Sequence, residues 1–235
     1  MSFFNRFHGI IFNPRETFKV ISEKPVWVDC LIILLILLAL FSYLVAPYLQ
    51  KDSLQTMKEN VKLKEKYGEE RYNQIIQRLE NPSKKSVLIR SFALGPLNYL
   101  VGFLFSSLIL LGMGRLTSVN GNYRQVFSAY LHANFVDKIL GNVLRLVLVF
   151  ARKSFMQTTT SFALLFPKLE MTSLAYIVFS QVDFFQLWLF GIFAYGLFSI
   201  FKIEQKKALI ISYSFWLLKS LLYIAIGLLT ASYMR

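Results

Sequence analysis

The sequence has few of the residues on which disulfide-stabilised proteins and many soluble enzymes depend. It contains one cysteine, Cys30, and two histidines among 235 residues. A single thiol cannot close an internal disulfide, which excludes a secreted disulfide scaffold. Only 17% of the residues are charged, against about 25% in an ordinary soluble domain. Acidic residues are especially scarce, since 13 of them face 26 basic ones.

Apolar residues are abundant instead. They make up 55% of the chain, with 23 Phe and 12 Tyr, and the mean hydropathy is +0.50. That many apolar groups cannot all be internal in a chain of this length, so the composition predicts a lipid environment. At about 20 residues per span, we expect an all-α polytopic membrane protein in one domain, 1–235, with five transmembrane helices at 27–49, 92–113, 126–150, 183–201 and 208–233.

A search for catalytic motifs gives negative results. His8 and His132 lie far apart and no H-E-x-x-H motif occurs, which excludes a zincin-type metal site. No G-K-[ST] phosphate loop and no G-x-S-x-G elbow is present. Cys30 at a membrane edge could be acylated, but a small apolar packing role is the stronger interpretation. We therefore expect a protein that is not an enzyme and that has no metal and no cofactor.

The segment before the first span, 1–26, predicts two short interfacial helices. In the first, Phe3, Phe7 and Ile10 share one face, and Arg6 lies on the polar side. The second begins at Asn13-Pro14-Arg15-Glu16. Asn13 is a capping residue, Pro14 suits the first helical position, and Glu16 can reach back as in a capping box. This helix should end before Pro25.

Two connecting segments are polar. Residues 50–91 carry ten basic and six acidic residues, yet apolar stripes at helical spacing predict a protruding helical hairpin. Its narrow apolar seam either packs on itself or docks a partner. Residues 151–182 are too interrupted to span, and we expect two short interfacial helices there.

The third span carries a polar stripe that includes Asn134, Asp137, Lys138, Asn142 and Arg145. A charged group at mid-bilayer costs at least about 2.5 kcal/mol on insertion scales. The stripe should therefore face other helices or water. Together with two charged residues on the last two spans, it forms the candidate intramembrane polar cluster: Asn134, Asp137, Lys138, Asn142, Arg145, Asp183 and Lys219.

Within this cluster we expect Asp137 to pair with Lys219 or Arg145, and Asp183 to pair with Lys138. One interpretation is structural, with interhelical contacts worth about 0.6 to 2 kcal/mol each that fix helix registration. A second is a polar cavity in which three cations outnumber two carboxylates and favour an anion such as a lipid phosphate. A third is a pathway for protons or ions.

Three ordered motifs add a resemblance to a known family. They are Asn13-Pro14-Arg15-Glu16 before the first span, Tyr123-Arg124 before the third, and Asp183-Phe184 with Trp188 and Gly196 in the fourth. Together with the number and order of spans, they make the chain resemble the Yip family, named for interaction with Ypt/Rab GTPases. The resemblance implies a five-span membrane protein of the bacterial type. Eukaryotic members act in vesicle traffic, and for the bacterial type the family supplies an architecture without a settled activity.

These observations favour a membrane-organising or partner-docking protein similar to a trafficking adaptor, with 50–91 as the docking element. The alternative is a small transporter or lipid-handling protein that uses the polar cluster. In a membrane chain the positive charge points to anionic headgroups rather than nucleic acid. We expect a bacterial inner membrane location. The resemblance favours a cytoplasmic N-terminus, whereas the positive-inside rule favours the reverse, with nine cations on the N-terminal side and fourteen on the other.

Overall fold

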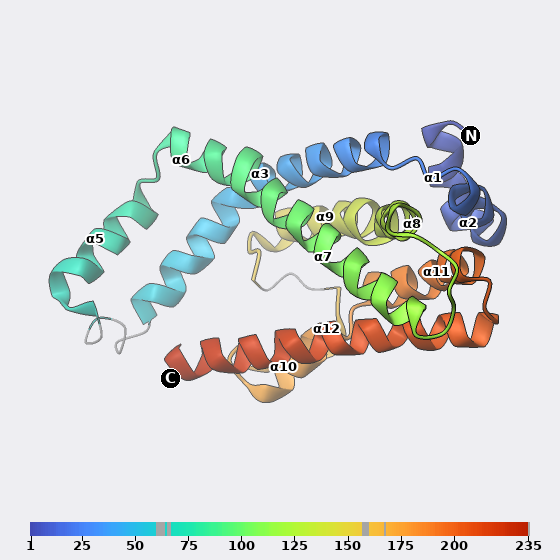
Figure 1. Ribbon diagram of the computed structural model, residues 1–235. Coiled ribbons are helices and arrows are strands. Elements are labelled where there is room, and N and C mark those ends of the chain that lie inside the picture. The colour runs from blue at the N-terminus through green and yellow to red at the C-terminus, as the bar shows by residue number, and fades with distance from the viewer. Residues whose placement is uncertain (60–63, 65–66, 157–159, 167, 235) are drawn as a thin grey trace.

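The computed structural model describes residues 1–59, 64, 67–156, 160–166 and 168–234. Within these residues every regular element is a helix, which confirms the all-α prediction. The long helices lie along one axis, and the N- and C-termini are at opposite ends of it (Figure 1). An odd number of membrane crossings places termini in this way.

Four helical segments in the described residues are long and apolar enough to cross a membrane: Val28–Lys58, Lys84–Arg115, Phe184–Phe201 and Gln205–Ser232. The first lies in α3 (Val28–Glu59), which continues about ten residues past the predicted end of the span. The second joins α6 (Lys84–Ile89), a π-helical turn η1 (Arg90–Leu94) and α7 (Gly95–Arg115). The others are α11 (Phe184–Phe201) and α12 (Gln205–Met234).

The predicted third span is the central helix of the bundle and is not one regular helix. It consists of α8 (Tyr123–Phe135), the π-helical turn η2 (Val136–Gly141) and α9 (Asn142–Arg152). Every residue from 126 to 137 is buried, because α8 packs against α1, α2, α3, α7 and α11. The polar stripe therefore faces neighbouring helices, as its cost in lipid predicts.

Two short helices close one end of the bundle. These are α1 (Phe3–Phe12) and α2 (Pro14–Glu23), and both pack against α8 (Figure 1). Pro14 begins the second helix as predicted, but the side chain of Asn13 makes no capping hydrogen bond. Instead Thr17 donates from Oγ1 to the carbonyl of Asn13 at 2.9 Å.

Arg6 departs from its predicted place on the polar side of α1. It is 4% exposed, and its guanidinium forms an ion pair with Asp29 at the start of α3. The helix as a whole is therefore docked on the bundle, with Ile10 fully buried and Phe4 80% exposed. Helical periodicity alone does not show this, because the partner carboxylate lies 23 residues further along the chain.

The predicted hairpin is present in the described residues, and its first arm is the polar end of α3. The second arm is α5 (Glu69–Glu80), which projects beyond the bundle (Figure 1). Tyr72 donates from its hydroxyl to the carbonyl of Met57 at 3.2 Å, and Gln50 donates to the carbonyl of Leu79 at 2.6 Å. The seam thus packs on itself between these arms. Val61, which at helical spacing belongs to the predicted apolar stripe of Leu54 and Met57, lies outside the described residues.

The segment after α9 contains a 3-10 turn, η3 (Phe162–Leu165), and one α-helix, α10 (Leu174–Gln181), where two short helices are predicted. α10 packs against the second half of α12 (Figure 1). The start of the segment is held by Asp52 of α3. One oxygen of Asp52, Oδ2, accepts from the hydroxyl of Ser154 and from the backbone N–H groups of Phe155 and Met156, at 2.9, 2.6 and 2.8 Å.

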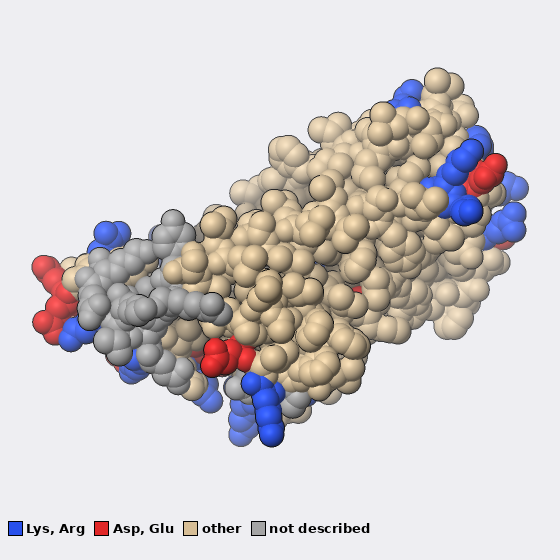
Figure 2. All heavy atoms as spheres, turned by 90° about the horizontal axis from the view of Figure 1, so that it is seen from below, with Lys and Arg blue, Asp and Glu red and all other residues tan. Residues whose placement is uncertain are grey.

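Charged side chains gather at the two ends of the molecule on the face seen in Figure 2, and the surface between them is almost free of charge. Exposed leucine, isoleucine and phenylalanine side chains cover α3, α7 and α12 in this middle zone. Such an apolar belt between two charged ends is the surface of a protein embedded in a bilayer. The chain is a multi-pass membrane protein.

Candidate functional site

The π-helical turn η2 carries the two charged residues at the centre of the polar cluster. Asp137 and Lys138 lie in this turn, where an i to i+5 pattern replaces the α-helical pattern. Such turns occur mostly as single interruptions of α-helices and frequently at functional sites. The side chain of Asp137 is 1% exposed and that of Lys138 is 19% exposed.

Arg145 of α9 connects two buried carboxylates. Its Nη2 lies 2.8 Å from Oδ1 of Asp137 and 3.1 Å from Oδ2 of Asp183. Asp137 also accepts from the ammonium group of Lys138 at 2.6 Å. The predicted pair between Asp137 and Arg145 is thus confirmed, but the predicted pair between Asp183 and Lys138 is wrong.

Asp183 has two roles because it stands at the N-cap of α11. Its Oδ1 accepts from the backbone N–H groups of Phe185 and Gln186 at 2.9 and 3.1 Å. These contacts satisfy donors that a helix start leaves free. The hydroxyl of Thr160 donates to Oδ2 of the same carboxylate at 2.5 Å and accepts from Nε of Arg145 at 3.1 Å. The cap of α11 is therefore part of the ion network.

Lys219 of α12, the alternative to Arg145 as the expected partner of Asp137, does not contact that carboxylate. Its ammonium group donates to Oε1 of Gln186 at 2.5 Å, and Nε2 of Gln186 donates to Oδ2 of Asp137 at 2.5 Å. Gln186 thus stands between the cation and the carboxylate. The predicted polar cluster did not include Gln186. Its position could have indicated a role, because it is an amide in the first turn of an aromatic-rich helix.

The two asparagines of the predicted cluster make local contacts. Asn134 donates from Nδ2 to the carbonyl of Tyr130 at 2.8 Å, one helical turn earlier. Asn142 accepts from Nη1 of Arg145 at 3.1 Å. Asn142 thus belongs to the ion network, and Asn134 lines the cavity beside it.

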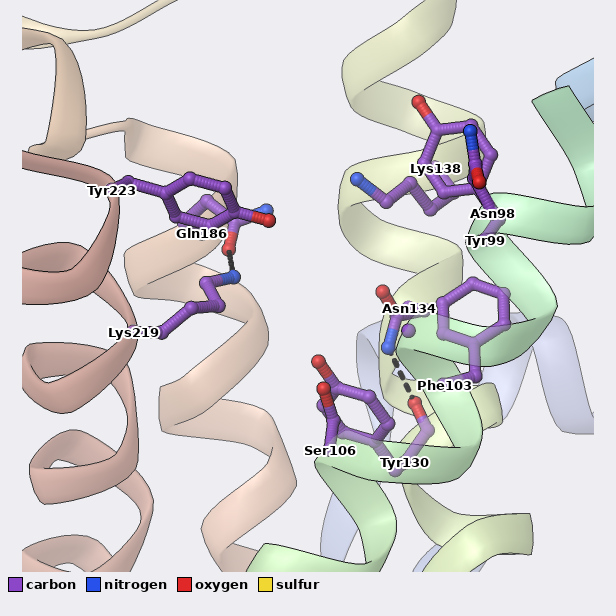
Figure 3. Close-up of a pocket in the computed structure, with 11 residues that line it drawn as sticks. Asn98, Tyr99, Phe103, Ser106, Tyr130, Asn134, Lys138, Gln186, Lys219 and Tyr223 are labelled. Atoms are coloured by element: carbon purple, nitrogen blue, oxygen red, sulfur yellow. Dashed lines mark hydrogen bonds between the residues drawn. The ribbon is translucent and has the colours of Figure 1, made fainter. Parts of the chain in front are cut away.

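A cavity of about 240 Å³ adjoins the network between α7, the central helix and α12. Figure 3 shows Lys138 and Lys219 extending from different helices with their ammonium groups directed toward the space between them. At about 30 Å³ per water molecule, the volume equals roughly eight waters. Its lining combines the two lysines with amide, hydroxyl and aromatic groups: Asn98, Tyr99, Gly102, Phe103, Ser106, Tyr130, Asn134, Lys138, Gln186, Lys219 and Tyr223.

The mouth of the cavity is at the side of the bundle. Tyr99 of α7 is 37% exposed and Tyr223 of α12 is 52% exposed, and both line the cavity. Val101 and Leu222, which lie close to these tyrosines in the two helices, are exposed apolar residues. The opening therefore faces the zone in which lipid surrounds the bundle.

The site lies deep in the bundle, far from both ends of the helices that carry its lysines. Lys219 is 14 residues from the first residue of α12, which at about 1.5 Å per residue is roughly 21 Å along the helix. Lys138 is 15 residues from Tyr123, the first residue of α8, which is roughly 22 Å. A hydrocarbon core is about 30 Å thick. Because α12 continues for 15 residues after Lys219 and the central helix for 14 residues after Lys138, both lysines lie near the middle of their helices.

The charges of the site do not balance. Three cations, Lys138, Arg145 and Lys219, share two carboxylates, and both carboxylates are paired with Arg145. Among the described residues Lys219 has no carboxylate within ion-pair distance. Its other neighbour is the ring of Phe190, 5.2 Å from Nζ. One positive charge at the cavity wall is left over.

The motif residues at the other end hold helices together rather than line the cavity. A Cβ at Gly196 of α11 would lie 3.1 Å from the Phe18 ring of α2 and 3.2 Å from Cβ of Ala129 in α8, so glycine permits this three-helix contact. Tyr123 donates from its hydroxyl to the carbonyl of Leu104 at 3.1 Å. The guanidinium of Arg15 lies 5.5 Å from the ring centre of Phe198.

The remaining motif residues are at helix starts or on the surface. Arg124 and Glu16 are exposed in the first turns of α8 and α2. Phe184 is 61% exposed, and Trp188 stacks on Phe185 with ring centres 6.5 Å apart. Only Asp183 belongs both to these motifs and to the ion network.

In the part of the chain that the structure describes, no three His, Cys, Asp or Glu side chains are grouped so that they could hold a metal ion. Cys30 is buried. His132 is fully buried and donates from Nδ1 to the carbonyl of Ser128 at 2.7 Å. The candidate functional site among the described residues is therefore the ion network together with the cavity beside it.

Comparison with known proteins identifies the family. No curated protein and no solved structure matches the chain. The sequence model of the Yip1 domain matches residues 9–227, which include α2 to α11, the ion network and the cavity. The chain therefore belongs to the Yip1 domain family.

Proposed function

We propose that this protein is a lipid-handling membrane protein that holds an anionic lipid headgroup in the cavity between α7, the central helix and α12. The observation that carries the proposal is Lys219, a cation at the cavity wall whose ammonium group is bonded to the neutral amide of Gln186. A lysine inside a bilayer costs a few kcal/mol unless it is paired. An anion in the cavity supplies the missing partner.

The alternative of a purely structural role explains part of the network but not the cavity. The contacts of Arg145 with Asp137 and Asp183 join α9, η2 and α11, which is what helix registration requires. Neither Lys138 nor Lys219 is needed for that link. Both line a cavity of about 240 Å³. Contacts that only fix the registration of helices do not require such a cavity.

The position of the mouth favours a lipid over a soluble anion. The cavity opens sideways beside Tyr99 and Tyr223, and the surrounding outward faces are apolar. A phospholipid can place its headgroup in the cavity while its acyl chains stay against these faces. A soluble anion gains nothing from them.

Thermal unfolding in detergent tests the proposal. We expect the melting temperature of the wild type to rise when phosphatidylglycerol is added, since a ligand that binds only the folded state stabilises it. Lys219→Gln should lose most of this rise. Lys206→Gln removes the same charge from an exposed site at the start of α12, outside the cavity, and should keep it.

Two results would contradict the proposal. The first is an equal rise for the wild type and for Lys219→Gln. The second is a rise of the same size with glycerophosphoglycerol, the soluble headgroup without acyl chains, which would make the ligand a soluble anion. If Lys219→Gln does not fold, Lys138→Gln replaces it in the comparison.

A second candidate function is partner docking by the hairpin, as in a trafficking adaptor. The supporting observation is the projection of α5 beyond the bundle, with exposed charges on both arms (Figure 1). The two arms already contact each other along the apolar seam, whose residues on α5 are half-buried, so the charged faces are the most accessible surface for a partner. Replacing residues 60–80 by a short Gly-Ser linker should abolish crosslinking to partners in cells. Recovery of the same partners would exclude this role.

For the location we propose the bacterial inner membrane with a cytoplasmic N-terminus, on the strength of the family. A reporter that is active only in the cytoplasm should be silent when fused after the last residue and active when fused before the first. The opposite pattern would contradict the proposed orientation.

A further inference from the structure

We infer that the cavity selects a phospholipid whose headgroup carries a single negative charge, a phosphodiester such as phosphatidylglycerol, over phosphomonoester and zwitterionic lipids. The inference rests on the proposed lipid-binding function and adds the class of headgroup. It follows from the number of charges around the cavity and from the kinds of polar group in its wall.

The network leaves room for one negative charge. Asp137 is satisfied by Lys138 and Arg145, and Asp183 is satisfied by Arg145. With these contacts in place, the one surplus charge is that of Lys219. A phosphodiester neutralises it, and the total charge of the filled site becomes zero.

A phosphomonoester brings a second negative charge that the site cannot match. Lys138 also lines the cavity, but its ammonium group lies 2.6 Å from Oδ2 of Asp137, so its charge is already compensated. Asp137 is 1% exposed and so has almost no contact with screening solvent. An uncompensated charge in such surroundings is costly. The doubly charged headgroup should therefore bind more weakly.

A zwitterionic headgroup meets the opposite problem. Its ammonium group needs an anion, and the described residues that line the cavity contain no Asp or Glu. The ammonium would instead stand near Lys138 and Lys219, which repel it. The uncharged groups in the wall, such as the amide of Asn98 and the hydroxyl of Tyr223, suit the hydroxyls of a headgroup alcohol, because both can donate and accept hydrogen bonds.

Native mass spectrometry of the detergent-solubilised full chain tests this selectivity. The probes are phosphatidylglycerol, phosphatidylmethanol, phosphatidate and phosphatidylethanolamine with identical acyl chains, at pH 7, where the second ionisation of a phosphomonoester is about nine-tenths complete because its pKa is about 6. We expect the two phosphodiesters to bind about tenfold more tightly than phosphatidate and phosphatidylethanolamine, a difference of about 1.4 kcal/mol.

Variants of Lys219 complete the experiment. Lys219→Gln should abolish the preference for phosphodiesters, Lys219→Arg should keep it because the charge is retained, and Lys206→Gln should behave as the wild type. If phosphatidate binds best and its binding depends on Lys219, the selectivity is wrong while lipid binding at this cavity stands. If Lys219→Gln binds every lipid as tightly as the wild type does, both the selectivity and the proposed function are wrong.

Discussion

Lys219 donates its hydrogen bond to the amide oxygen of Gln186 at 2.5 Å, and the other end of the same amide donates to Asp137 at 2.5 Å. The amide therefore separates a cation from a carboxylate that could have neutralised it directly. Because both side chains come from helices that pack tightly, this separation is built into the bundle. It keeps one positive charge available at the wall of the cavity.

Replacing Gln186 tests this arrangement. Gln186→Leu leaves Lys219 without its hydrogen-bond partner, and loss of one partner of a buried polar group costs about 1 to 3 kcal/mol. We expect the unfolding free energy to fall by that amount in detergent alone. Part of the loss should be recovered on addition of phosphatidylglycerol, which offers Lys219 another partner.

The matched control is Gln181→Leu in α10, which removes an amide that bonds to the carbonyl of Ile177 away from the cavity. Its stability should show no greater response to the lipid than that of the wild type. If added lipid restores no stability to Gln186→Leu, the cavity does not supply the partner of Lys219.

Two substitutions of Asp183 separate its capping role from its ionic role. Asp183→Asn keeps an oxygen that can cap α11 but loses the charge that Arg145 contacts at 3.1 Å. Arg145 retains Asp137, so the expected loss is smaller than the roughly 3 to 5 kcal/mol of a fully broken buried pair. Asp183→Ala also removes the cap and should cost about 0.5 to 2 kcal/mol more. Equal unfolding free energies for the two variants would show that the cap contributes nothing.

The ion pair between Arg6 and Asp29 should respond unequally to loss of its two members. The Arg6 side chain is 5% exposed and the Asp29 side chain is 41% exposed. Asp29→Asn leaves a buried cation without its partner and should cost about 3 kcal/mol or more, whereas Arg6→Met leaves a carboxylate that water can reach. The measurement is the rate of proteolysis between α1 and α3, which should rise more for Asp29→Asn. A larger effect of Arg6→Met would contradict this account of how α1 is held.

Asp52 should control the order of the segment that follows α9. In Asp52→Ala the backbone N–H groups of Phe155 and Met156 lose their acceptor, so their hydrogen exchange should become faster. Glu80→Gln is the control, because it breaks the exposed pair with Lys58, and such pairs contribute about 1 kcal/mol or less. Unchanged exchange at Phe155 and Met156 in Asp52→Ala would show that other contacts hold this segment.

Hydropathy and charge were sufficient to predict most of the architecture. Apart from single end residues, four of the predicted spans lie within helices that can cross a membrane, because lipid requires long apolar segments whatever their neighbours are. The polar stripe on the third segment was correctly expected to face inward for the same reason. What its residues contact could not be predicted in this way.

The ion partners depend on how helices rotate against each other. The turn η2 changes the direction in which Asp137 and Lys138 point, and no sequence pattern marked it. Arg145 contacts Asp183 in addition to the expected Asp137, and Lys219 contacts Gln186 rather than Asp137. The burial of Arg6 was missed because its partner Asp29 belongs to the next long helix.

The central claim is that an anionic headgroup occupies the cavity beside Lys138 and Lys219. Cryo-electron microscopy of the protein in nanodiscs containing phosphatidylglycerol tests it most directly. The account predicts phosphate density within hydrogen-bond distance of the Lys219 ammonium group, with acyl-chain density leading out between α7 and α12. A cavity filled by protein side chains, with Lys219 paired to a carboxylate of its own chain, would contradict it.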